Sequence, residues 1–106
     1  MDEENKTDLS FDNLNLKDDL LRGVYSYGFE NPSKIQSLAV PKIVSGKDLI
    51  AQAHSGTGKT GAFSIGSLQK MDETKKETQV LIISPTHELV HQTTDVIKEL
   101  SKYQGI

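Results

Sequence analysis

Residues 48–60, DLIAQAHSGTGKT, say most about the fold that the sequence predicts. The apolar start over 48–53 is typical of a short strand, and a helical pattern follows over 59–71. In the loop between them, Gly56 and Gly58 let the backbone curl so that several N–H groups face one anion. The helix that follows adds its positive N-terminal end. Strand, glycine loop and helix in this order indicate a phosphate-binding loop; a surface loop rich in small residues is the alternative.

The residues of this loop, AHSGTGKT over 53–60, have separate expected roles. Lys59 supplies a mobile positive charge for the outer phosphates, and the Thr60 hydroxyl is placed to ligate Mg²⁺, so these two carry the predicted catalytic role. Ala53 stands where the usual pattern has glycine, and His54 is expected to face solvent rather than act as a base. The predicted nucleotide-binding set in this loop is Ala53, His54, Ser55, Gly56, Thr57, Gly58, Lys59 and Thr60.

The flanking segments predict an α/β domain. Residues 79–84, QVLIIS, read as a strand buried on both faces of a parallel sheet, and a last helix follows from His87 to about Tyr103. Amphipathic helices are expected over 16–27 and 32–44, the second kinked or split at Pro41. Two strands with one crossover do not make a stable sheet, so the chain reads as the first part of a larger domain and is expected to be poorly soluble alone.

Composition excludes several classes of protein. The chain has 106 residues, a net charge of -3 and no cysteine, which excludes a disulfide scaffold, a thiolate zinc site and a cysteine nucleophile. No apolar run approaches the roughly 20 residues of a membrane-spanning helix, and no secretory signal is present, so an intracellular protein is expected. Residues 1–10, MDEENKTDLS, are expected to form a disordered acidic tail.

A second segment indicates which nucleotide is bound. Residues 28–36 read GFENPSKIQ, and Phe11 lies seventeen residues before Gly28. The Gln36 amide can donate and accept at once, which matches the N6/N7 edge of adenine and not guanine, and Phe11 offers a ring on which the base could stack. A solvent-facing glutamine and a core phenylalanine are the alternatives.

With these segments the chain resembles the DEAD-box ATP-dependent RNA helicases, especially their translation initiation factor four-A branch. The resemblance implies a Q-motif helical segment over 11–46 and the first part of a RecA-like ATP-binding domain over 47–106, with ATP and Mg²⁺ as cofactors. It implies single-stranded or short duplex RNA as partner, together with translation or RNA-processing factors and no membrane. The family's Asp-Glu-Ala-Asp segment does not occur in this sequence, so these 106 residues alone are expected to be inactive and to unwind RNA only within a longer chain. The alternative is a truncated, non-catalytic fragment that only binds ATP.

The resemblance also implies RNA contact at residues 85–90, PTHELV, where the family usually has Pro-Thr-Arg-Glu-Leu-Ala. The implied RNA-binding residues are Pro85, Thr86, His87 and Glu88. Histidine lacks the permanent charge and planar fork of arginine, so weaker RNA affinity is expected. The same substitution creates an HExxH string, His87 to His91, which is the pattern of a zinc metalloprotease site. A phosphate-loop ATPase acting on DNA or protein is a further alternative.

Overall fold

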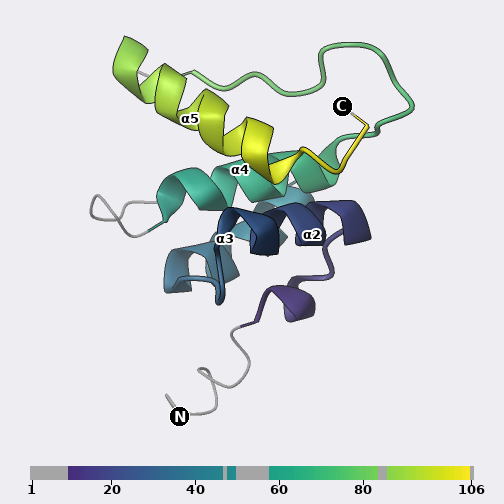
Figure 1. The fold of residues 1–106 in the computed structure, drawn as a ribbon, viewed down its shortest axis with the longest axis vertical. Helices are drawn as coiled ribbons and strands as arrows, with labels where there is room; N and C mark the ends of the chain where they lie inside the picture. Colours follow the sequence, from purple (N-terminus) through teal and green to yellow (C-terminus); the bar gives the residue numbers. More distant parts are fainter. Residues whose placement is uncertain (1–9, 47, 50–57, 84–85, 106) are drawn as a thin grey trace.

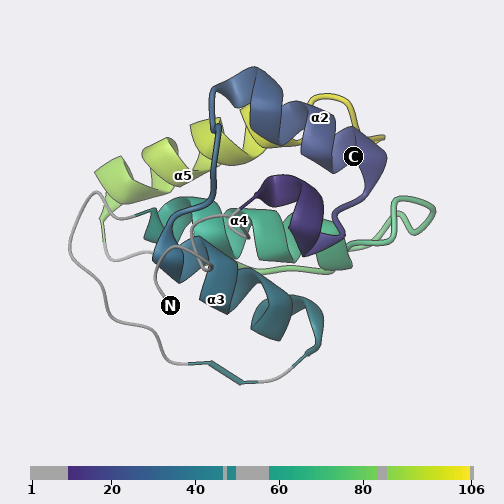
Figure 2. The same ribbon diagram turned by 90° about the horizontal axis from the view of Figure 1, so that it is seen from below.

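The computed structural model describes residues 10–46, 48–49, 58–83 and 86–105, and it is helical there (Figure 1). A short 3-10 helix, η1, spans Phe11–Leu14. The α-helices are α2, Asp18–Tyr27, α3, Lys34–Val44, α4, Lys59–Lys70, and α5, His87–Leu100. Helix α4 lies at the centre and packs against α2, α3 and α5, as the two ribbon views show (Figures 1 and 2). Helix α4 is therefore held by elements that precede it and by one that follows it in the chain.

The ends of the helices follow from local sequence. Ser33 begins α3 with a capping box, and the Thr86 hydroxyl begins α5 by accepting from the Leu89 N–H at 3.1 Å. Gly28 ends α2 in the left-handed conformation, with φ +111°. Helix α3 runs through Pro41 without a break, so the predicted split is wrong. A proline removes only one helical hydrogen bond, and α3 ends with the Ser45 N–H bound to the Pro41 carbonyl at 3.0 Å.

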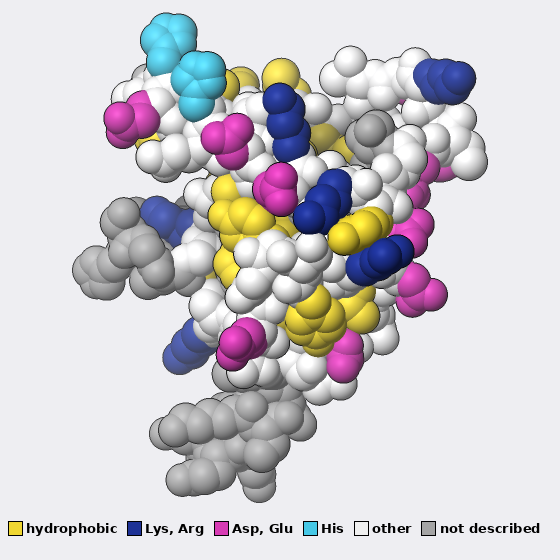
Figure 3. Space-filling view, viewed as in Figure 1, with side chains coloured by type: hydrophobic (Ala, Val, Ile, Leu, Met, Phe, Trp, Pro, Cys, Tyr) yellow, Lys and Arg dark blue, Asp and Glu magenta, His cyan; other side chains and the backbone are white. Residues whose placement is uncertain are grey.

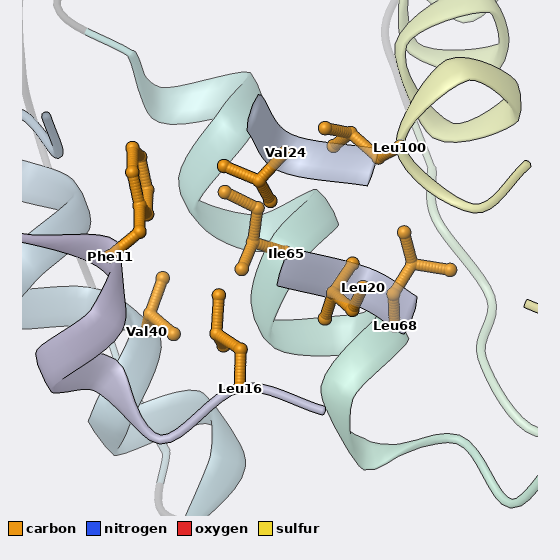
Figure 4. Packing of buried hydrophobic residues seen from close by; sticks show 8 residues of the cluster. All are labelled: Phe11, Leu16, Leu20, Val24, Val40, Ile65, Leu68 and Leu100. Atoms are coloured by element: carbon orange, nitrogen blue, oxygen red, sulfur yellow. The ribbon is translucent and has the colours of Figure 1, made fainter. Parts of the chain in front are cut away.

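One apolar core joins every helix. Its members are Phe11, Leu16, Leu20, Val24, Val40, Ile65, Leu68 and Leu100, and their side chains converge on α4 (Figure 4). Burying a large apolar side chain contributes about 1.5–3 kcal/mol to the free energy of folding. Burial of this cluster is therefore the main contribution that holds α2, α3 and α5 against α4.

The predicted parallel sheet is not formed in the described residues, which contain no strand. Residues 79–83 lack strand structure, and Leu81 and Ile83 are 78% and 85% exposed, so the predicted strand with two buried faces is not observed there. A strand is stable only when a neighbour pairs with its backbone, and the described residues supply none. Most of the other predicted strand, residues 50–53, and the tail residues 1–9 lie outside the described residues.

Candidate nucleotide-binding site

The start of α4 carries the described part of the predicted phosphate loop. Gly58 is the N-cap of α4 with φ +96°, a left-handed conformation that favours glycine, and no side chain caps the helix. The N–H groups of the first turn lack helical partners, and together with the exposed Lys59 they can attract an anion. Ala53, His54, Ser55, Gly56 and Thr57 lie outside the described residues.

Gln36 is buried, with 3% of its surface exposed, and it connects α3 to α4. Its Nε2 donates to the Gly58 carbonyl at 3.2 Å, and its Oε1 accepts from the Ser33 N–H at 3.0 Å. The Ser33 hydroxyl in turn accepts from the Gln36 N–H at 3.3 Å. The alternative of a solvent-facing glutamine is therefore wrong. The structure instead brings together the two segments that the sequence assigned to adenine and to phosphate.

Two glycines leave room for the Gln36 amide. A Cβ on Gly58 would lie 2.6 Å from Gln36 Nε2, and a Cβ on Gly61 would lie 2.7 Å from it. The Gly61 Cβ would also lie 3.3 Å from Phe29 Cζ. Sequence reasoning missed Gly61, although a glycine inside a helix, where it costs about 1 kcal/mol, signals close packing. These contacts fix the amide between α3 and the first turn of α4.

Aromatic side chains form a cluster beside this amide. The Phe29 ring stacks on Phe11 at a centroid distance of 6.1 Å, and Tyr27 lies 4.9 Å from Phe29. Phe11 is completely buried and also meets Tyr25 edge-on at 6.2 Å. The structure thus gives Phe11 core contacts, and through Phe29 it connects Phe11 to Gly61. Phe29 was missed as a contact residue, although it lies within the GFENPSKIQ segment.

An open cavity of about 1530 Å³ adjoins these residues. Gly58, Lys59 and Thr60 line it together with Tyr27 and Phe29. A small-molecule site usually occupies roughly 300–1,000 Å³, so this cavity is larger than one such site needs. Most of the remaining lining is aliphatic, from α3, residues 79–83 and α5, and Gln36 and Phe11 are not among the lining residues. The helix start and Lys59 therefore form the polar part of a largely apolar cavity.

The predicted RNA-binding segment lies at the start of α5. The Thr86 hydroxyl is engaged as the helix cap, His87 and Glu88 are exposed, and Pro85 lies outside the described residues. Over the described part of the chain no group of three His, Cys, Asp or Glu residues could hold a metal ion. A catalytic zinc site has three protein ligands, so the protease alternative lacks its third ligand there. In the same residues no helix is long and apolar enough to cross a membrane.

Comparison with known families and curated proteins supplies the context for this site. Residues 33–106 match the family described as DEAD/DEAH box helicase. The protein named ATP-dependent RNA helicase FAL1 from Saccharomyces cerevisiae (strain ATCC 204508 / S288c) is 58% identical over 101 residues, which are 95% of this chain and 25% of that protein. ATP-dependent RNA helicase eIF4A from Yarrowia lipolytica is 56% identical over 97 residues, 92% of this chain and 25% of that protein. The chain thus spans about a quarter of the length of these relatives.

Solved structures show the same arrangement of elements. S. cerevisiae Dbp5 bound to RNA and ADP BeF3 is similar with a TM-score of 0.88 and 40% identity, over 92% of this chain and 25% of that one. A DEAD box protein from the hyperthermophile Methanococcus jannaschii is similar with a TM-score of 0.81 and 34% identity, over 87% of this chain and 25% of that one.

Proposed function

This chain belongs to the DEAD/DEAH box helicase family, and on that basis we propose that it binds ATP as part of an ATP-dependent RNA helicase. Adenine lies against Gln36, and the phosphates lie at the start of α4. The likeness to solved DEAD-box structures supports a RecA-like domain in which residues 48–53 and 79–84 become strands of a parallel sheet. An intracellular location, with translation or RNA-processing factors as partners, is part of the same proposal.

One observation carries the proposal: the Gln36 side chain bonds to the Gly58 carbonyl at 3.2 Å. The amide nitrogen has two donors and the amide oxygen two lone pairs, and the contacts with Gly58 and Ser33 use one of each. One donor and one acceptor of this buried amide have no further partner among the described residues, and these are the groups that we propose to meet the N6/N7 edge of adenine. Guanine offers a keto oxygen where adenine has its amino group, so only adenine meets both requirements.

The residues of the helix start fit the phosphates and Mg²⁺. A Cβ on Gly58 would fill the space beside the amide, so glycine keeps this corner open. Lys59 is exposed and free to turn toward the outer phosphates, and the Thr60 hydroxyl would hold Mg²⁺. When bound, Mg²⁺ neutralises charge on the β- and γ-phosphates. The outer loop residues, Ala53 to Thr57, complete the same proposed cradle.

RNA is the proposed second ligand, and it contacts the start of α5. The likeness to Dbp5, a protein whose solved structure is bound to RNA, supports RNA as the ligand class. Exposed His87 and Glu88 and the cap residue Thr86 are the side chains offered to it, with Pro85 before them. Unwinding coupled to hydrolysis needs the groups of the Asp-Glu-Ala-Asp segment, which this sequence does not contain, so the activity proposed for these residues alone is binding.

Nucleotide titration tests the proposal directly. We expect this chain to bind a fluorescent ATP analogue more tightly than the matching GTP analogue, and Lys59→Ala to weaken both alike. Equal affinity for the two bases, or no binding of either, would overturn the assignment. RNA and DNA of one sequence, compared as ligands of the ATP-loaded chain, separate an RNA helicase from a phosphate-loop ATPase that acts on DNA.

A further inference from the structure

We propose that His87 and His91 form a two-imidazole chelate for a divalent transition-metal ion at the exposed start of α5. The site is separate from the cavity that takes the nucleotide, and it is not a protease centre, because it has two protein ligands rather than three. Zn²⁺, Ni²⁺ and Cu²⁺ are the ions that neutral imidazole nitrogens prefer.

Helix geometry brings the two rings together. Both residues lie within α5, His87–Leu100, four positions apart, so they occupy one face of the helix with their Cβ atoms about 6 Å apart. Both are exposed, and the space-filling view shows the two histidines of the described residues side by side at one end of the molecule (Figure 3). Each ring is free to turn a nitrogen toward a shared ion without displacing a core residue.

The charge around the pair also permits a cation. The partial positive charge at the helix N-terminus opposes a cation, but only weakly at an exposed position. Glu88 lies in the same first turn and Asp95 lies one turn beyond His91; both carboxylates are exposed, and they offset this repulsion. The whole chain carries a net charge of -3, so no general positive field repels the ion. Since no third ligand group is present in the described residues, water completes the coordination.

A bound ion would change the surface that we propose for RNA. His87 belongs both to the metal chelate and to the proposed RNA-binding surface, so this effect on RNA rests on the proposed function. An ion held there places two positive charges where the related motif has an arginine, beside the expected path of RNA phosphates. The metal site itself needs no nucleotide and no RNA, so it can be tested without either.

The test is calorimetric titration of this chain with a zinc salt alone, in a buffer that does not bind metal. We expect one ion per chain, and His91→Gln to weaken its binding by about tenfold or more, because the second imidazole then no longer acts intramolecularly. The matched control is the double variant His91→Gln with Gln92→His, which keeps the number of histidines but breaks their spacing. It should bind as weakly as His91→Gln.

Two results would overturn the site. One is an absence of zinc binding by the unaltered chain at millimolar metal. The other is a double variant that binds zinc as tightly as the unaltered chain, which would show that the four-residue spacing of His87 and His91 does not hold the ion. Both altered positions are exposed, so the variants should keep the helix content of the unaltered chain, and far-ultraviolet circular dichroism without metal checks this. ATP binding in the same preparations reports on the nucleotide site independently.

Discussion

Replacing Gln36 with leucine tests the contact on which the nucleotide site depends. Leucine keeps the approximate size and helix propensity of glutamine but cannot bond to the Ser33 N–H or the Gly58 carbonyl, which Gln36 holds at 3.0 and 3.2 Å. Each such bond contributes about 1 kcal/mol net, and the gain from burying leucine offsets part of the loss. We therefore expect the free energy of unfolding to fall by about 1–2 kcal/mol and the preference for ATP over GTP to disappear.

Urea unfolding and nucleotide titration of the same preparation measure the two effects. The matched control is Gln69→Leu, because Gln69 Oε1 accepts from the Lys17 N–H at 2.7 Å, away from the nucleotide site. This control should lose about 1 kcal/mol of stability and keep the preference for ATP. If Gln36→Leu unfolds at the same urea concentration as the unaltered chain, the hydrogen bonds of the Gln36 amide do not stabilise the packing of α3 against α4. If it still prefers ATP, Gln36 does not read the base.

Three further predictions concern packing, pH and RNA. Gly23→Ala should lower the free energy of unfolding, measured in urea, by about 1–3 kcal/mol, because the added Cβ would overlap the Leu100 carbonyl. This overpacking exceeds the gain of about 1 kcal/mol that alanine brings in helix propensity. An unchanged urea midpoint would contradict the close contact between α2 and α5. The hydrogen bond that Lys17 Nζ donates to Glu73 at 3.0 Å lowers the pKa of the Glu73 carboxylate. The Lys17–Glu73 pair therefore stabilises the fold fully above the ordinary pKa of glutamate, and this stabilisation is lost as the pH falls through the lowered pKa of Glu73. Thermal unfolding across acidic pH should show that loss in the unaltered chain, and persistence of the same loss in Glu73→Gln would refute its origin in the pair. His87→Arg should tighten RNA binding and steepen its dependence on salt by about one counterion, measured by fluorescence anisotropy, and identical salt curves would rule out phosphate contact there.

Local sequence predicts the helices well because their signals are local. The capping residues Ser33 and Thr86 and the terminal Gly28 set helix ends within a few residues of the expected positions. The structure of residues 79–83 could not be predicted in the same way, because apolar runs become strands only when another strand pairs with them. The residues QVLII therefore have a high propensity for a strand, but the strand forms only when a second strand pairs with their backbone.

In the candidate site, too, some features follow from local sequence and others depend on tertiary packing. The pattern around Gln36 predicts the chemistry of the amide, while its bond to Gly58 depends on how α3 packs against α4. The burial of Phe11 and its stacking on Phe29 likewise arise from tertiary packing, and spacing in the sequence carries no sign of either. The roles proposed for Phe11 and for the loop residues before Gly58 remain predictions.

The contact between α2 and α5 has a consequence for how the protein is made. Gly23 meets the Leu100 carbonyl, so an early helix receives part of its apolar cover from the last one. At a synthesis rate of about 5–20 residues per second, roughly 4–15 s pass between translation of these two positions. During that interval the apolar face of α2, with Leu20 and Val24, lacks the cover that Leu100 supplies in the folded protein.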